Sequence, residues 1–193
     1  ISATENDHRL QAALFKTLSL CLLLVMLWSQ TGLVGLPVWW VTLGLVSAIV
    51  ADCLYIYRKF PRLSFSGFIS SQLCYSAAFW FSLSGDIVWW LPALLFGIGV
   101  VCFFLLLPLI DRLIFPVVIM GSVLLQLNWA AGEVWLLSYD FRSGIGFIGT
   151  FMLTLSAGLL AIHYYRKSTD KPYYLISGSY LVAHSLITTS FIN

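Results

Sequence analysis

The sequence predicts an all-α protein, a polytopic bundle of transmembrane helices that forms a single domain over residues 1–193. Three observations support this. Of the 193 residues, 60% are hydrophobic and 9% are charged, whereas charged residues make up about 25% of a typical soluble domain. The apolar residues come in runs of about 20, the length that a helix needs to cross a bilayer. These runs use nearly the whole chain, which leaves no room for a separate soluble domain.

Seven spans are expected in this chain, after a polar arm at residues 1–9. Helix-breaking residues separate them, for example at residues 29–32, 84–86 and 168–172. The fourth and fifth spans are divided only by a tight segment at residues 108–112. The predicted spans are about Leu10 to Trp28, Leu36 to Tyr57, Ser64 to Leu83, Ile87 to Leu109, Leu113 to Trp135, Gly144 to Tyr165 and Tyr173 to Ile192.

Basic residues are distributed unevenly over the predicted loops. Of the ten lysines and arginines, Arg142 lies on one side and Lys16 inside a span, which leaves eight on the other side. Because cytoplasmic loops carry the excess of Lys and Arg, we expect the arm in the cytoplasm and the C-terminus outside. Most tryptophans lie near the predicted outer interface, as in an interfacial aromatic belt. The eight basic residues are Arg9, Arg58, Lys59, Arg62, Arg112, Arg166, Lys167 and Lys171.

Asp52 is the acid around which we expect a site to be organised. It lies about one and a half turns inside the second span, and a charged side chain at bilayer depth costs about 2.5–3.5 kcal/mol even on the lenient insertion scale. Other polar residues reach comparable depths, so the set fits one cavity that opens toward the cytoplasmic leaflet. They are Lys16, Gln72, Ser156, Tyr180 and His184.

The seventh span has a polar stripe on one face. Tyr173, Ser177, Tyr180, His184 and Thr188 follow one another at intervals of four, three, four and four residues. The stripe fits two interpretations: the wall of a pocket, or interhelical hydrogen bonds worth about 0.6 kcal/mol each.

Asp52 and Lys16 are open to two interpretations as well. They form a structural ion pair, or Lys16 extends to the interface; alternatively Asp52 acts as an acid or base. Glu133 lies near the outer end of the fifth span, where a structural or interfacial role is favoured over a catalytic one.

Motifs of other enzyme classes do not occur. The sequence has no G-x-S-x-G, no H-E-x-x-H, no glycine-rich phosphate loop and no cluster of histidines. Four cysteines lie in apolar runs without a C-x-x-C pair, so we interpret them as packing residues. We therefore expect no metal, no cofactor and no nucleic-acid partner, and the lack of an internal repeat argues against a transporter.

The ordered set of short motifs resembles the YhhN-like family of membrane proteins, which includes the lysoplasmalogenases. It covers about 180 residues. The matching stretches are Phe15-Lys16-Thr17-Leu18-Ser19, Ala51-Asp52, Gly67-Phe68 with Gln72 and Tyr75, Ala131-Gly132-Glu133-Val134-Trp135, and Tyr180 with His184.

The resemblance implies a fold of eight spans, and a hydrolase that converts lysoplasmalogen to a fatty aldehyde and a glycerophospho-alcohol in a bacterial inner membrane. Asp52 matches the first of two family aspartates, but Ala157 follows Ser156 where relatives have the second. We therefore expect Asp52 and His184 to be catalytic. Lys16, Gln72, Tyr75, Ser156 and Tyr180 are expected to bind a lysophospholipid or another single-chain amphiphile; a non-catalytic lipid-binding protein remains the alternative.

Overall fold

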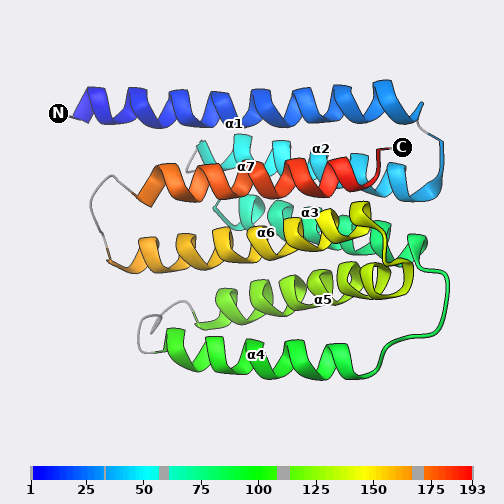
Figure 1. Ribbon diagram of the computed structural model, residues 1–193. Coiled ribbons are helices and arrows are strands. Elements are labelled where there is room, and N and C mark those ends of the chain that lie inside the picture. Colours follow the sequence, from blue (N-terminus) through cyan, green and yellow to red (C-terminus); the bar gives the residue numbers. More distant parts are fainter. Residues whose placement is uncertain (1, 33, 57–60, 108–113, 167–171, 193) are drawn as a thin grey trace.

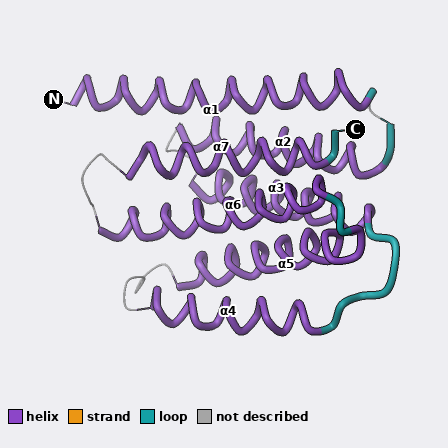
Figure 2. The backbone as a smooth tube through the Cα atoms, in the orientation of Figure 1, coloured by secondary structure: helices purple, strands orange, loops and turns teal. Residues whose placement is uncertain are grey.

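The computed structural model describes residues 2–32, 34–56, 61–107, 114–166 and 172–192, with side chains described from Leu14 onward except at 56, 106 and 163–174. Within these ranges the chain folds into seven helices and has no strand (Figure 2). The prediction of an all-α fold is confirmed. The helices are α1 Ser2–Thr31, α2 Leu36–Ile56, α3 Pro61–Ser82, α4 Trp90–Leu106, α5 Ile114–Ser138, α6 Phe141–Arg166 and α7 Pro172–Ser190.

Proline and glycine mark several helix boundaries. Pro61 and Pro172 are the first residues of α3 and α7, where the fixed φ of proline and its missing N–H cost nothing. After α1 ends, Gly32 and Gly35 have φ values of 59° and 103°, a conformation that glycine adopts without a steric penalty. Four predicted starts differ from the structure by three residues or more. α1 begins at Ser2, so the expected polar arm is helical, and α3, α4 and α6 begin at Pro61, Trp90 and Phe141. The tight segment at residues 108–112 lies outside the described residues.

Six of the helices form a closed ring. Each packs against the next in the order α1, α2, α3, α5, α6 and α7, and α7 packs back against α1. α4 packs on α5 outside this ring, and Figure 1 shows α1 and α4 at opposite edges of the bundle. α1 begins and α7 ends at opposite ends of the bundle (Figure 1).

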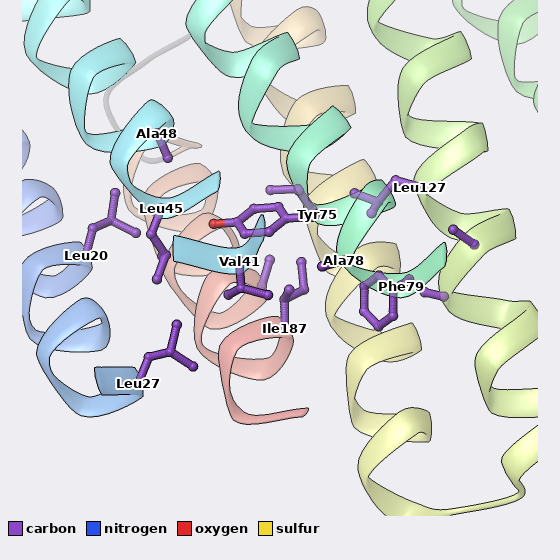
Figure 3. Packing of buried hydrophobic residues seen from close by; sticks show 14 of the residues in the cluster. Leu20, Leu27, Val41, Leu45, Ala48, Tyr75, Ala78, Phe79, Leu127 and Ile187 are labelled. Atoms are coloured by element: carbon purple, nitrogen blue, oxygen red, sulfur yellow. The ribbon is translucent and has the colours of Figure 1, made fainter. Parts of the chain in front are cut away.

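A continuous apolar core fills much of the ring. Leu20 of α1, Leu45 of α2, Leu127 of α5 and Ile187 of α7 are fully buried in it, and Figure 3 shows several of these side chains around Tyr75. Small residues on α2, α3, α5 and α7 let the helix backbones approach closely, as is common in membrane proteins. These small core residues are Ala48, Ala78, Ala130, Ala131 and Ala183.

Length and composition agree with membrane insertion. Segments of α1, α2, α5 and α6 are long and apolar enough to cross a membrane, and α4 contains a shorter apolar segment, Trp90–Leu105. α3 and α7 are more polar because they contribute buried side chains to the inside of the ring, for example Gln72 and His184. Large apolar side chains such as Phe104 and Phe115 are exposed on the outer surface. The chain is thus a membrane protein with transmembrane helices.

Tryptophans gather at one end of the bundle, as the sequence predicts. They lie at the last turns of α1, α3 and α5 and near the starts of α2 and α4, the ends that meet on the side where α7 finishes. Side chains of basic residues are described only for Arg62 and Arg142 among those that predict the orientation; both are exposed, at the starts of α3 and α6. The tryptophans are Trp28, Trp39, Trp40, Trp80, Trp89, Trp90 and Trp135.

A polar network joins α5 to α6. The Asn128 amide nitrogen donates to the Leu124 carbonyl at 2.8 Å and to the Thr154 hydroxyl at 2.7 Å. Its oxygen accepts from the Thr150 hydroxyl at 3.0 Å. Because these polar atoms satisfy one another, the network needs no ligand and serves to hold the two helices together.

Candidate active site

The carboxyl of Asp52 is held inside the ring by a tyrosine from α7. Asp52 is 5% exposed, and the Tyr180 hydroxyl donates to its Oδ2 at 3.1 Å. The two residues are 128 positions apart in the chain. The hydrogen bond therefore joins α2 to the face of α7 that carries the predicted polar stripe. Oδ1 of Asp52 takes no part in this hydrogen bond.

A second tyrosine holds the imidazole of His184. The Tyr75 hydroxyl on α3 lies 2.7 Å from Nδ1 of His184, and both side chains are buried. Nε2 of His184 is also buried and has no hydrogen-bond partner among the described residues. Buried polar atoms without a partner are uncommon in folded proteins and need an explanation such as a bound molecule or a catalytic role.

Aromatic contacts join the two pairs into one cluster. The rings of Tyr180 and His184 lie 4.4 Å apart between centroids, and Phe68 of α3 meets Tyr180 edge to face at 6.3 Å. The ammonium of Lys16 lies over the Tyr180 ring, 5.0 Å from its centroid, a distance at which a cation and a ring attract each other. Lys16 also interacts electrostatically with Asp52. Lys16 thus faces the cluster instead of extending toward the membrane interface.

Gln72 and Ser156 occupy different places from the cluster itself. Gln72 lies on α3 between Phe68 and Tyr75, and its amide nitrogen contacts the Met120 sulfur of α5 at 3.2 Å. The Gln72 oxygen is buried without a partner among the described residues. Ser156 donates to the Ile176 carbonyl at 3.0 Å, so its hydroxyl links α6 to α7.

Glu133 forms its hydrogen bonds at the other end of the bundle. Its two carboxylate oxygens accept from the Val88 backbone N–H at 3.2 and 2.9 Å, and one also accepts from the Trp129 indole at 2.8 Å. Val88 lies just before α4. The fully buried carboxylate therefore fixes the entry into α4, which agrees with the structural role that the sequence favours.

The cluster is enclosed, which differs from the open cavity expected from the sequence. Asp52, Tyr75 and His184 are each at most 5% exposed, because aromatic rings fill the space around them. The two described cavities lie elsewhere. One of about 450 Å³ runs along α4 beside Gly97, and one of about 360 Å³ lies at the end of the bundle near Arg142.

Two residues at or next to this cluster were not predicted to take part in the site. Phe68 belongs to a matched motif but was not expected in the site, and Ser64 was only the predicted start of a span. Ser64 is buried beside α2 and donates to the carbonyl of Ala51, the residue before Asp52. A serine in the first turn of a helix is common, so only its distance of three residues from Gly67 could have drawn attention to it.

Together, the fold and the site define an integral membrane protein in which a ring of helices encloses a carboxyl and an imidazole, each held by a tyrosine. The chain belongs to the YhhN family, whose model matches residues 11–191. The membrane protein YhhN of Escherichia coli O6:H1 is 24% identical over 192 residues, which cover 98% of this chain and 91% of the relative. YhhN proteins of Escherichia coli O157:H7 and Shigella flexneri match equally well. No solved structure matches the chain.

Proposed function

We propose that this protein is a lysoplasmalogenase-like membrane hydrolase, which cleaves the vinyl ether bond of a lysoplasmalogen to give a fatty aldehyde and a glycerophospho-alcohol. One observation carries the proposal: an acid and an imidazole, each hydrogen-bonded to a tyrosine, meet through the 4.4 Å contact between Tyr180 and His184. Vinyl ether hydrolysis needs a proton donor for carbon and a base for water, and this pair supplies both.

The first step is proton transfer to carbon. Asp52, as a carboxylic acid, gives its proton to the alkene carbon remote from the ether oxygen, and the alkene electron pair forms the new C–H bond. The Tyr180 hydroxyl engages Oδ2, so Oδ1 is the oxygen that carries the proton. The carbon attached to oxygen becomes an oxocarbenium ion, and the carboxylate left behind stabilises it.

The second step adds water. With Nδ1–H of His184 donating to the Tyr75 oxygen, Nε2 keeps its lone pair and takes a proton from water as the oxygen attacks the oxocarbenium carbon. The hemiacetal then loses its glycerol oxygen as a hydroxyl, which takes the proton from His184, and the C=O of the aldehyde forms. The proton of the hemiacetal hydroxyl returns to Asp52, so the overall reaction consumes one water.

Substrate binding follows from the charges near this cluster. Lys16 is the described cation closest to the site, so it binds the phosphate of the headgroup, and the free oxygen of Gln72 accepts a hydrogen bond from substrate or water. The cluster is sealed from the aqueous ends and surrounded by lipid-facing helices, which suits a single-chain amphiphile that enters from the bilayer. We place the protein in a bacterial inner membrane with the α1 start in the cytoplasm, in keeping with its basic loops.

A second candidate is a lipid-binding protein of this fold without catalytic activity. Ala157 favours it, because this residue packs against the core at the position where the resemblance leads us to expect a second aspartate. The enclosed cluster then binds the same amphiphile and leaves its vinyl ether intact.

Aldehyde release by the purified protein in nanodiscs distinguishes the two candidates. Wild type is expected to release one aldehyde per lysoplasmalogen consumed, and Asp52→Asn none. Asp86→Asn is the matched control, since Asp86 is exposed in the loop before α4. Binding of lysoplasmalogen without aldehyde release by the wild type refutes the hydrolase and supports the second candidate.

A further inference from the structure

The last turns of α2 are tied to α3 at the residue next to Asp52. The Ser64 hydroxyl donates to the Ala51 carbonyl at 2.9 Å, and both residues are buried, at 2% and 0% exposed. A serine hydroxyl in a helix commonly bonds a carbonyl of its own helix, as Ser66 does with Leu63 in the same helix. Ser64 instead reaches across to α2, so this bond connects the two helices.

α3 also packs closely against Ala51 at Gly67. A Cβ added at Gly67 would lie 2.9 Å from the Ala51 Cβ and 3.3 Å from its Cα. Ordinary contact begins at 3.4 Å, so an alanine there must push the helices apart by about 0.5 Å. Ser64 and Gly67 are three residues apart and therefore share one face of α3.

We propose that Ser64 and Gly67 are positioning residues for Asp52. They fix the rotation and height of α2 at Ala51, and hence the direction in which the next side chain points. A carboxyl lies roughly 5 Å from its helix axis, so a rotation of about 10° moves it by roughly 1 Å. That displacement breaks the Tyr180 hydrogen bond or misplaces the acid, and a misplacement of about 1 Å can lower a rate about 100-fold. This inference rests on the proposed function for its kinetic consequence only.

The test exchanges side-chain volume across the contact. Gly67→Ala is expected to lower kcat by about 10- to 100-fold with little change in KM, since Lys16 is untouched. Adding Ala51→Gly removes the opposing Cβ and leaves a closest approach of 3.3 Å, so the double variant recovers most of the lost kcat. Gly121→Ala on α5 is the matched control, because nothing lies within 4 Å of a Cβ there.

Ser64 gives a second variant that leaves the contact volume almost unchanged. Ser64→Ala is expected to lower kcat several-fold, and Ser66→Ala, which loses only a bond within its own helix, is expected to leave it as in the wild type. Equal kcat values for Ser64→Ala and Ser66→Ala contradict the positioning role of the hydroxyl.

A readout that does not depend on turnover separates this inference from the proposed function. In protein labelled with carboxyl-13C aspartate, the Asp52 resonance is assigned by its loss in Asp52→Asn. It is expected to shift in Gly67→Ala and to return in the Ala51→Gly, Gly67→Ala double variant. An unmoved resonance in Gly67→Ala, or a shift that the double variant fails to reverse, overturns the inference, even where the wild type releases no aldehyde.

Discussion

Removing the Tyr75 hydroxyl is the most direct single test of whether its hydrogen bond holds the His184 imidazole in place. Tyr75→Phe keeps the ring that packs in the core and deletes only the oxygen 2.7 Å from Nδ1 of His184. Interhelical hydrogen bonds in membranes average about 0.6 kcal/mol and reach about 1.7. Both partners here are almost fully buried, so we expect a loss near the upper limit, about 1–1.7 kcal/mol.

Such a loss changes the unfolding equilibrium about 10-fold. It is measured by denaturant titration of the purified protein, followed by tryptophan fluorescence. We also expect kcat for aldehyde release to fall about 10- to 100-fold, because the imidazole is no longer held in one orientation.

Tyr139→Phe is the control, since Tyr139 is 82% exposed, and it should change neither quantity. A double-mutant cycle with His184→Ala isolates the pair, and the expected coupling free energy is about 1 kcal/mol. If the coupling free energy is near zero and kcat of Tyr75→Phe equals that of the wild type, the Tyr75 hydroxyl does not orient the His184 imidazole.

Three further substitutions separate structural groups from the site. Glu133→Ala leaves the Val88 N–H without its acceptor. We expect the free energy of unfolding to fall by about 1–3 kcal/mol and hydrogen exchange at Val88 to become faster. Unchanged exchange contradicts the role of Glu133 in fixing the entry into α4. Asn128→Ala breaks two links to α6 and lowers the free energy of unfolding by about 1 kcal/mol without changing KM, and a raised KM counts against a purely structural network. Ser156→Ala removes only the bond to the Ile176 carbonyl, so we expect KM to be unchanged. A several-fold increase in KM would support the substrate-binding role that the sequence predicts for Ser156.

Much of the fold is predictable because membrane insertion constrains it strongly. Apolar runs, breakers and the tryptophan belt locate the seven helices of the described ranges, since each run must bond its own backbone inside the bilayer. Helix boundaries are less predictable. Residues 2–9 are polar, so hydropathy does not indicate that they are helical, yet they continue α1 as its first turns. The exclusion of α4 from the ring was not predicted, although α4 contains no charged residue and no Ser, Thr, Asn or Gln, in contrast to the helices of the ring.

For the candidate site, the sequence indicates which polar residues lie at similar depths, but it does not indicate which of them form hydrogen bonds with one another. Spacing on α7 indicates that Tyr180 and His184 share a face, and Asp52 attracts attention because acids are rare at that depth. The pairing of Tyr180 with Asp52 and of Tyr75 with His184 depends on the order of the helices around the ring. This order could not be predicted from a single sequence. Tyr75 and Ser156 were expected to bind substrate, and their hydrogen bonds to His184 and to the α7 backbone were not predicted.

Hydrolysis of lysoplasmalogen in heavy water tests the central claim, that Asp52 delivers a proton to the alkene carbon. The aldehyde is reduced to its alcohol as it forms, which prevents later exchange. We predict that the wild-type product carries one deuterium on the carbon next to the former aldehyde carbon, and that Asp52→Asn gives no product. An aldehyde without that deuterium, or an equal yield from Asp52→Asn, contradicts the account.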